Sequence, residues 1–462
     1  MIGLGTMGRS LLLNMADHGY AVAGLDQDAT KVTSLNEEGK DKDVKGFSDA
    51  KEFVQSLTKP RAIMMLVPAG KIVDAVIAEM TPLMDKGDIL IDGGNSHFTD
   101  TNRRVDELEA QGFHFFGMGV SGGEEGARRG PSMMPGGDKE AYNVMKPIFE
   151  AIAAKVDGEP CVTYIGPGAS GHFVKMVHNG IEYGLMQLIA EAYQIMKTGL
   201  KMDNAAMGKV FAQWNDGRLK SFLLDITKDI FAFNAPGTDH LLLDDIKDEA
   251  KAKGTGKWTS QVAMDLQAPI PTVDTAVSMR DLSKYKSLRV QAAAVYSKDA
   301  IELDGDKGEL LSALEQAFYF SMIVTYAQGM HLLSLASAEY KYDLKLDEIA
   351  KIWRGGCIIR SEFLNDIYNA YQNKGLAHLL LDSHVEDLVK AAVPGARKVL
   401  SATIAAGIAA PAFTASLSYF DNFRTARMPS NLTQAQRDYF GAHTYELIGK
   451  EGVFHTQWTA KS

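Results

Sequence analysis

The chain has 462 residues, enough for two or three domains that each bury a hydrophobic core. Apolar residues make up 46% and charged residues 23%, as in ordinary soluble globular proteins, and no apolar run reaches the length of a transmembrane helix. The net charge of −10 and the lack of a Lys/Arg-rich run argue against a nucleic-acid-binding protein, although local basic residues could still bind a small anion.

The two cysteines, Cys161 and Cys357, are too few and too far apart for a disulfide framework or a metal-ligand cluster. The eleven histidines are scattered without an H-E-x-x-H pattern, so we expect no catalytic metal. The N-terminus lacks a charged segment followed by an apolar signal core. Together these features predict a cytoplasmic protein.

A glycine-rich turn opens the chain. Gly3, Gly5 and Gly8 match G-x-G-x-x-G, in which glycines permit a tight turn, close approach of a pyrophosphate and close helix–strand packing. The helix that follows would offer its N-terminus to phosphate. The next apolar strand, residues 21–25, ends in Asp26, at the spacing of the acidic residue that binds a ribose 2′-hydroxyl. These concordant signals favour a dinucleotide site over an ordinary glycine turn.

Only Met1 and Ile2 precede Gly3, although the first strand of such a fold normally contains several apolar residues. Either the central strand is short or the sequence is shortened at its start. We expect weaker packing at the centre of the sheet without loss of the fold.

Three further apolar runs, residues 62–67, 88–92 and 114–120, alternate with helical segments and predict a parallel, doubly wound α/β sheet. A Gly-Gly-Asn-Ser turn at 93–96 follows the second run, and a Ser-Gly-Gly turn at 121–123 follows the third. Ligands bind such sheets at the carboxyl ends of the strands, so we expect both turns to contribute to a site rather than to be surface turns.

Gly166-Pro167-Gly168 marks a candidate domain boundary, after which helix-period segments dominate. An internal repeat follows, because the motifs at Trp214 and Phe222 recur about 140 residues later at Trp353 and Phe363. We therefore predict three parts, which are a Rossmann-like dinucleotide-binding domain at 1–168, a duplicated all-helical domain at 169–430 and a C-terminal tail at 431–462.

One helix of the second part carries a stripe of polar side chains. Lys175, His178, Asn179 and Glu182 follow the i, i+3, i+4, i+7 spacing of a single helix face. An amine, an imidazole, an amide and a carboxylate on an otherwise apolar helix are typical either of a lined cleft or of a solvated face. The spacing alone does not separate these two interpretations.

Two later segments carry further polar groups. Residues 254–259, Gly-Thr-Gly-Lys-Trp-Thr, resemble a phosphate-binding loop in composition but lack the Walker A spacing, and Arg280 follows in a helical context. Arg437 and His443 lie among aromatic residues of the tail. This pattern favours either a packed terminal helix or a segment that docks on another subunit.

Taken in order, these motifs resemble those of the 6-phosphogluconate dehydrogenase family in its long, duplicated form, over essentially the whole chain. The resemblance implies oxidation of 6-phosphogluconate at its 3-hydroxyl by hydride transfer to a nicotinamide. Loss of CO2 then gives ribulose 5-phosphate, in the pentose phosphate pathway. It further implies that Lys175 is the general base and Glu182 the acid that protonates the enediol, without a metal.

The resemblance also implies two sets of binding residues. The substrate would be held by Asn95, Ser121, Gly122, Gly123, His178, Asn179, Tyr183, Lys257, Thr259 and Arg280, with Arg437 and His443 from the partner subunit of a homodimer. The dinucleotide would be held by Gly3, Gly5, Thr6, Met7, Gly8, Asp26, Gln27, Val67, Ala69 and Asn95.

The dinucleotide site departs from the common pattern of the family. Many members place Asn-Arg-Thr after the second strand, where the Arg and the hydroxyl bind the 2′-phosphate of NADP. Here the aligned residues are Asp26, Gln27 and Asp28, and carboxylates repel a phosphate while Asp26 can accept from ribose hydroxyls. We expect preference for NAD over NADP, unless Lys31 or Arg9 neutralises the phosphate.

Two other functions compete with this interpretation. A β-hydroxyacid dehydrogenase acting on a small unphosphorylated acid would share the N-terminal half and Lys175. The repeat, Lys257, Arg280 and the tail argue against it. A dinucleotide-binding sensor without catalysis is the second alternative, against which the intact Lys175 and Glu182 argue.

Overall fold

The computed structural model describes residues 1–296 and 301–459. The chain divides into two compact units, Met1–Ala415 and Ser416–Ser462. None of the described helices is both long enough and apolar enough to span a membrane.

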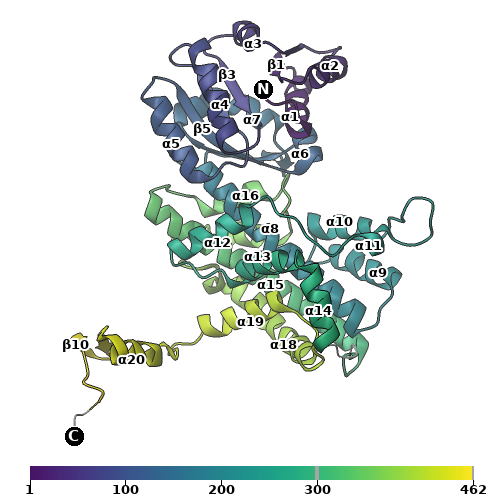
Figure 1. Cartoon of the computed structure of the whole chain (residues 1–462), viewed down its shortest axis with the longest axis vertical. Coiled ribbons are helices and arrows are strands. Elements are labelled where there is room, and N and C mark those ends of the chain that lie inside the picture. The colour runs from purple at the N-terminus through teal and green to yellow at the C-terminus, as the bar shows by residue number, and fades with distance from the viewer. Residues whose placement is uncertain (297–300, 460–462) are drawn as a thin grey trace. The chain divides into compact units, whose positions relative to one another are not determined.

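The first part of the larger unit is a β-sheet with helices on both faces (Figure 1). Its strands are β1 (Val22–Leu25), β2 (Val44–Phe47), β3 (Ala62–Met65), β4 (Ile89–Asp92), β5 (His114–Ser121) and β6 (Ser132–Gly137). The helices are α1 (Thr6–Asp17), α2 (Ala29–Glu38), α3 (Ala50–Ser56), α4 (Lys71–Met80), η1 (Thr81–Leu83), α5 (Phe98–Glu109), α6 (Gly123–Arg129) and α7 (Lys139–Ile152). The predicted Rossmann-like domain is confirmed.

The central strand consists of a single bridging residue. Ile2 pairs in parallel with Leu25 of β1 and with Met65 of β3, and so joins the β1–β2 pair to the β3–β6 sheet. Its amide donates to Met64 O at 2.7 Å, and its carbonyl accepts from Leu66 N at 2.9 Å. On the other side, Met1 O accepts from Leu25 N at 2.8 Å and Gly3 N donates to Leu25 O at 2.9 Å. Three residues therefore connect the halves of the sheet, and weaker packing at this point stays a prediction.

The strands predicted from the three apolar runs pair in parallel as expected, but a further strand that the sequence did not indicate makes the sheet mixed. Strands β3, β4 and β5 are parallel, but β6 runs antiparallel to β5. Only the seven-residue helix α6 lies between β5 and β6. A parallel return needs a crossover of roughly a dozen residues or more, so this short connection forces the antiparallel pairing.

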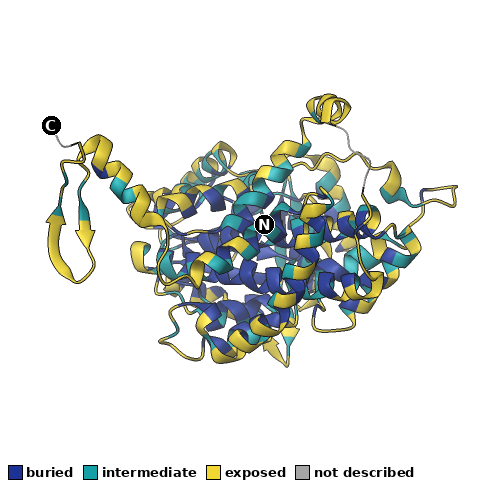
Figure 2. Cartoon of the chain, turned by 90° about the horizontal axis from the view of Figure 1, so that it is seen from below, coloured by how far each residue is buried: buried dark blue, intermediate teal, exposed yellow. Residues whose placement is uncertain are grey.

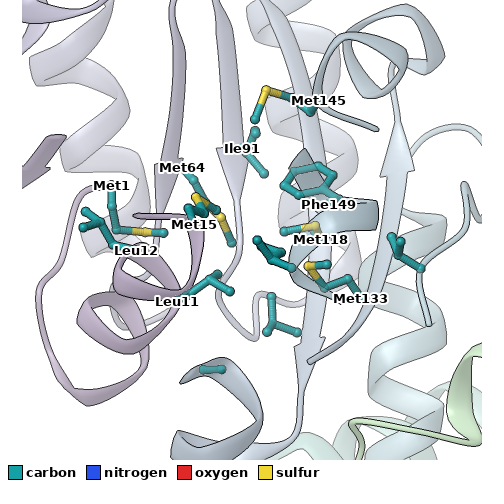
Figure 3. Close-up of a cluster of buried hydrophobic side chains, with 14 of the residues drawn as sticks. Met1, Leu11, Leu12, Met15, Met64, Ile91, Met118, Met133, Met145 and Phe149 are labelled. Carbon is teal, nitrogen blue, oxygen red and sulfur yellow. The ribbon is translucent and has the colours of Figure 1, made fainter. Parts of the chain in front are cut away.

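Successive side chains of the strands belong alternately to two separate hydrophobic cores. Met64 and Ile91 (Figure 3) pack with Phe116 on one side, against α1 and α7. Ile63 and Phe115 pack on the other side with α3, α4 and α5. Successive side chains of a strand point to opposite faces, and both faces here are covered by helices. This burial on both sides explains the near-continuous apolar runs in the sequence.

The remainder of the larger unit is mostly helical, with a small β7–β8 ribbon (Lys155–Val156 and Glu159–Pro160) before it. Two long and largely buried helices, α8 and α15, pack on each other within its core. Figure 2 shows the buried residues in the interior, with exposed residues around them. The elements are α8 (Ser170–Gln194), η2 (Ile195–Gly199), α9 (Asn204–Asn215), α10 (Phe222–Ile230), α11 (Leu242–Asp245), α12 (Thr255–Asp265), α13 (Pro271–Ser283), α14 (Lys286–Tyr296), α15 (Lys307–Tyr340), α16 (Leu346–Trp353), α17 (Phe363–Ala370), η3 (Leu379–Leu381), α18 (Ser383–Ala405) and the start of α19 (Pro411–Phe423), whose residues from Ser416 on belong to the smaller unit.

The predicted repeat has a structural counterpart in the order of these helices. The series α8, α9, α10 and α13 corresponds to α15, α16, α17 and α19. The copies meet at an antiparallel bridge between Ser221 and Ser361, where Phe222 N donates to Arg360 O and Glu362 N donates to Lys220 O, both at 3.0 Å. These reciprocal bonds give the pair of copies an approximate two-fold relation.

Each copy also caps a helix of the other. Glu191 of α8 accepts from Ala412 N at 2.9 Å and from Phe413 N at 3.1 Å, at the start of α19. Gln328 of α15 accepts from Thr272 N at 3.1 Å, at the start of α13. Free N–H groups at buried helix starts need acceptors. The exchanged caps therefore tie the two copies together.

The buried carboxylate of Glu191 predicts a pH-dependent stability. Burial raises its pKa to about 7 from an ordinary value of 4.5. The folded state therefore favours the protonated acid, and wild type loses stability relative to Glu191→Gln as pH rises from about 5 to about 8. The loss in the free energy of unfolding of wild type, relative to that of Glu191→Gln, should approach about 3 kcal/mol. Denaturant unfolding at fixed protein concentration measures this difference.

Gln328→Glu is the matched control, because it places a titrating acid at the equivalent cap and should introduce the same trend. A stability difference between wild type and Glu191→Gln that does not change with pH would contradict this interpretation of the Glu191 cap.

Candidate active site

The three glycines of the N-terminal turn differ in their surroundings. Gly3 has a φ of +89°, and a Cβ there would lie 2.5 Å from Leu66 O, while a Cβ on Gly8 would lie 1.9 Å from Gly3 O. A Cβ on Gly5 would meet nothing within 4 Å. Gly5 is the N-cap of α1, whose first turn has no acidic residue and no side-chain cap. Open space beside free helix N–H groups fits a pyrophosphate.

The other predicted dinucleotide residues lie near the ends of α1 and of two strands. Thr6 is exposed and Met7 half-buried in the first turn of α1, while Val67 is half-buried and Ala69 exposed after β3. Val67 also lies next to the turn, since its Cγ1 is 3.1 Å from the Cβ position of Gly3. The structure thus brings β3 and the glycine turn together.

Asp26, just after β1, is bonded to this turn. Its Oδ2 accepts from Leu4 N at 2.8 Å, and its Oδ1 accepts from Asp28 N at 2.9 Å. The amine of Lys31 is 3.4 Å from both oxygens. Gln27 and Asp28 are exposed beside it. The segment therefore presents two carboxylates next to the glycine turn, with its nearest cation already paired.

The turn after β4 is shaped by Asp92. This fully buried carboxylate accepts from Gly94 N at 3.0 Å and from the hydroxyl of Ser96. The buried hydroxyl of Ser96 therefore already has a partner within the protein, whereas Asn95 is exposed. Asn95 is the residue of this turn that is free to meet a ligand.

The turn after β5 meets the polar face of α8. Ser121 is buried, and its hydroxyl lies 3.2 Å from Nε2 of His178. Gly122 and Gly123 have φ values of +118° and +64°, which glycine adopts readily. A Cβ on Gly123 would meet nothing within 4 Å, so space for a ligand remains there.

The polar face of α8 is not a solvated face, so that interpretation was wrong. Lys175 is 6% exposed, and its stem packs on β5, where a Cβ on Gly119 would lie 2.4 Å from Lys175 Cβ. Its amine lies 3.4 Å from Nδ1 of His178. Burial lowers the pKa of Lys175 to about 8, although Glu182 partly opposes the shift. A substantial fraction of this amine is therefore neutral at mildly alkaline pH.

The neighbouring His178 is a neutral, fixed side chain. It is fully buried, its Nδ1 lies 3.1 Å from Oδ1 of Asn179, and its ring packs edge-on against Trp353. Burial, reinforced by the charge of Lys175, lowers the pKa of His178 well below its ordinary value. A neutral imidazole can donate one hydrogen bond and accept another without adding a charge beside Lys175.

The other end of this face carries an acid and an aromatic ring. Burial raises the pKa of Glu182, and the charges of Lys175 and Arg280 only partly oppose the shift. The buried ring of Tyr183 lies under the guanidinium of Arg280, whose Cζ is 3.6 Å from the ring centroid. This cation–π contact holds a positive charge close to Glu182.

The N-terminus of α12 lies against the same part of α8. Its N-cap Gly254 has a φ of +101°, and its first turn has no side-chain cap and no acidic residue. Lys257 is exposed in this turn. Thr259 is buried, and its hydroxyl donates to Met176 O at 2.8 Å. The helix end and Lys257 can hold an anion, while the Thr259 hydroxyl binds α12 to α8.

The two predicted residues of the tail belong to the smaller unit. Arg437 lies on α20 (Ser430–Gly441) and donates to Oε1 of Gln434 at 3.1 Å, and His443 follows the end of this helix. A hairpin of β9 (Tyr445–Leu447) and β10 (Lys450–Phe454) comes next. The sequence had suggested either a packed terminal helix or a docking segment for this region, and it did not indicate the hairpin. Gly449, at positive φ, lies in the turn of this hairpin, and Gly452, also at positive φ, lies at a register shift within β10.

The structure adds residues of the second helical copy that the sequence did not indicate. Ile358 N donates to the Ser121 hydroxyl at 3.4 Å, and a Cβ on Gly122 would lie 2.5 Å from Gly356 O. Trp353 packs on His178. The available signal was a departure from the repeat, since Gly355-Gly356 stands where the first copy has Asp216-Gly217.

Two family models match the chain. The NAD binding domain of 6-phosphogluconate dehydrogenase matches residues 1–166, and the C-terminal domain of 6-phosphogluconate dehydrogenase matches residues 171–458. A Bacillus subtilis relative, named 6-phosphogluconate dehydrogenase, NADP(+)-dependent, decarboxylating, is 50% identical over 460 residues, which cover 99% of this chain and 98% of the relative.

An Escherichia coli K12 relative, named 6-phosphogluconate dehydrogenase, decarboxylating, has the same identity and coverage. The Plasmodium falciparum 6-phosphogluconate dehydrogenase, solved in its apo form and in complexes with NADP+ and with 6-phosphogluconate, superposes with a TM-score of 0.96. It is 44% identical, with 99% of each chain covered. This chain therefore belongs to the family of decarboxylating 6-phosphogluconate dehydrogenases.

Proposed function

We propose that this protein oxidises 6-phosphogluconate at its 3-hydroxyl and decarboxylates the product to ribulose 5-phosphate and CO2. The observation that carries the proposal is the presence on one face of α8 of Lys175, whose pKa is lowered, and Glu182, whose pKa is raised. A base must be neutral and an acid protonated, and burial favours both forms. We assign dinucleotide binding to residues 1–168, catalysis to the helical residues 169–430 and site completion to the tail at 431–462.

The first chemical step needs a base beside the 3-hydroxyl. The neutral amine of Lys175 takes the hydroxyl proton as the hydride leaves C3, so that C3 becomes a carbonyl and the amine an ammonium. The nicotinamide dinucleotide, when bound, supplies the hydride acceptor. Because His178 stays neutral, Lys175 is the group whose charge changes in this step. The ammonium of Lys175 then faces the new carbonyl oxygen.

The second step is decarboxylation of the β-keto acid. The bond between the carboxyl carbon and C2 breaks, and its electron pair forms the C2–C3 double bond while the ammonium of Lys175 protonates the C3 oxygen. The carbonyl accepts the electrons, so no metal is required. Glu182 then protonates the carbon that carried the carboxylate, and Lys175 takes the hydroxyl proton back, which yields the ketone.

Substrate binding divides between two groups of residues. We assign the hydroxyls and carboxylate to Asn95, Ser121, Gly122, Gly123, His178 and Asn179, and the phosphate to Tyr183, Lys257, Thr259 and Arg280. The free N-terminus of α12, with Lys257 in its first turn, supports the phosphate assignment. Thr259 would have to redirect its hydroxyl from the carbonyl of Met176 to take part.

We further propose a homodimer in which Arg437 and His443 of each tail complete the site of the other subunit. Large apolar side chains are exposed both on α14, where Val295 is 73% exposed, and in the tail, where Phe440 is 73% and Ile448 84% exposed. Exposed large apolar side chains on either element support a role for that element in an interaction surface.

Replacement of Lys175 tests the proposed reaction. Wild type is expected to reduce the nicotinamide and release CO2 with 6-phosphogluconate, and not to turn over 3-hydroxyisobutyrate. Lys175→Met should lower kcat by about 10²–10⁴-fold, because the base is lost, while the dissociation constant of the dinucleotide stays unchanged.

Lys175→Arg is the matched control, since arginine keeps the positive charge but does not deprotonate. It should be as inactive as Lys175→Met. Near-normal kcat in either variant would rule out Lys175 as the base, and turnover of 3-hydroxyisobutyrate in place of 6-phosphogluconate would rule out the proposed substrate.

For the dinucleotide we propose preference for NAD, although the Bacillus subtilis relative is named as NADP(+)-dependent. The hydrogen bond from the Thr30 hydroxyl holds the pKa of Asp28 below its usual range, so a 2′-phosphate would meet an ionised carboxylate. The two candidate cations for offsetting this repulsion already have partners. Lys31 lies 3.4 Å from Asp26, and Arg9 lies 3.3 Å from Glu38.

The ratio of kcat/KM for NAD to that for NADP measures this preference and is expected to exceed one. Gln27→Arg combined with Asp28→Thr should shift the ratio toward NADP by roughly tenfold to a hundredfold, because a charged hydrogen-bond donor replaces a repelling carboxylate. Lys31→Met serves as the control and should leave the ratio nearly unchanged. A wild-type ratio below one, with NADP use lost in Lys31→Met, would contradict the proposal.

A further inference from the structure

Most of the tail is exposed (Figure 2), but Asp438 of α20 is fully buried. The Oδ1 atom of Asp438 accepts from Thr444 N at 2.9 Å and lies 2.8 Å from Nδ1 of His455. Its Oδ2 accepts from Thr456 N at 3.0 Å and from Nε1 of Trp458 at 2.8 Å. One carboxylate thus joins α20 to the start of the hairpin and to the segment that follows it.

The same residue fixes an unusual turn around His443. Ala442 and Thr444 have φ values of +50° and +62°, a left-handed conformation that is rare for residues with a Cβ. Ala442 N donates to Asp438 O at 2.9 Å, and Thr444 N donates to the Asp438 side chain. Both strained residues are therefore bonded to Asp438, and strain of this kind persists only where the surroundings enforce it.

The turn also connects His443 to Arg437. The side-chain amide of Gln434 donates to Thr444 O at 2.6 Å, and its Oε1 accepts from Arg437 at 3.1 Å. The ring of His443 lies on the other side against Gly441, where a Cβ would be 2.5 Å from its Nε2. Arg437 is thus linked through Gln434 to the turn that holds His443, and Asp438 bonds to the residues on both sides of His443.

We propose that Asp438 is a positioning residue for substrate binding. It assembles Arg437 and His443 into a preformed pair before the tail meets the partner subunit, which lowers the entropic cost of ordering both side chains around the substrate. This inference rests on the proposed role of the tail in completing the partner's site.

The test is a double-mutant cycle in the full-length protein. Asp438→Asn keeps the shape of the side chain but replaces a carboxylate oxygen, which accepts hydrogen bonds, by an NH2 group, which cannot accept them from the four donors. This variant should raise KM for 6-phosphogluconate roughly tenfold or more, with a smaller change in kcat. Arg437→Met combined with His443→Ala should raise KM as well. Because Asp438 acts through these two residues, Asp438→Asn should raise KM little further in that background.

Additive effects of the two changes, or an unchanged KM in Asp438→Asn, would overturn the positioning role. An unchanged KM in the Arg437→Met, His443→Ala protein would instead overturn the proposed function of the tail. Should Asp438→Asn disrupt the tail, Trp458→Phe removes only one of the four donors and should give a smaller rise in KM that vanishes in the same background. Glu451→Gln, an exposed carboxylate on β10, is the control with unchanged KM.

Discussion

The site depends on the burial of one amine against a strand. The stem of Lys175 occupies the space that a side chain at Gly119 of β5 would need, so the helix and the sheet approach closely enough to exclude water from the amine. The lowered pKa of Lys175, about 8 instead of 10.5, corresponds to a net penalty of about 3 kcal/mol on the ammonium, in which desolvation outweighs the attraction of Glu182. The same burial raises the pKa of Glu182 and keeps His178 neutral. One packing constraint therefore sets the protonation of three groups in the directions that acid–base chemistry needs.

Duplication of the helical unit gives this face its rigid surroundings. The first copy carries Lys175, while the second copy supplies Trp353 against His178 and the amide of Ile358 to Ser121. The copies exchange helix caps through Glu191 and Gln328, so neither copy can shift without breaking buried hydrogen bonds of the other. Side chains held in this way lose little freedom when a substrate binds, which favours catalysis through preorganisation.

The local patterns in the sequence predicted much of this arrangement. Helical spacing placed Lys175 and Glu182 on one face of α8, and the glycine motif located the tight turn before α1, because both patterns depend on contacts close in sequence. The antiparallel β6 was missed, since the alternation of strands and helices does not reveal strand direction. The contribution of Ile358 was missed too, because its amide meets Ser121 only through tertiary packing, and a backbone donor leaves no signature in residue type. Whether the helix face was buried also could not be decided from spacing alone.

The central claim, that burial makes Lys175 a base, is tested most directly by titrating its amine. The ¹³C NMR signal of the ε-carbon can be followed against pH in protein labelled at lysine, with Lys175→Arg used to assign the resonance. The expected result is a midpoint at about 8, well below that of the exposed lysines. A midpoint near the ordinary lysine value of 10.5 would show that the amine stays charged, and would contradict the account.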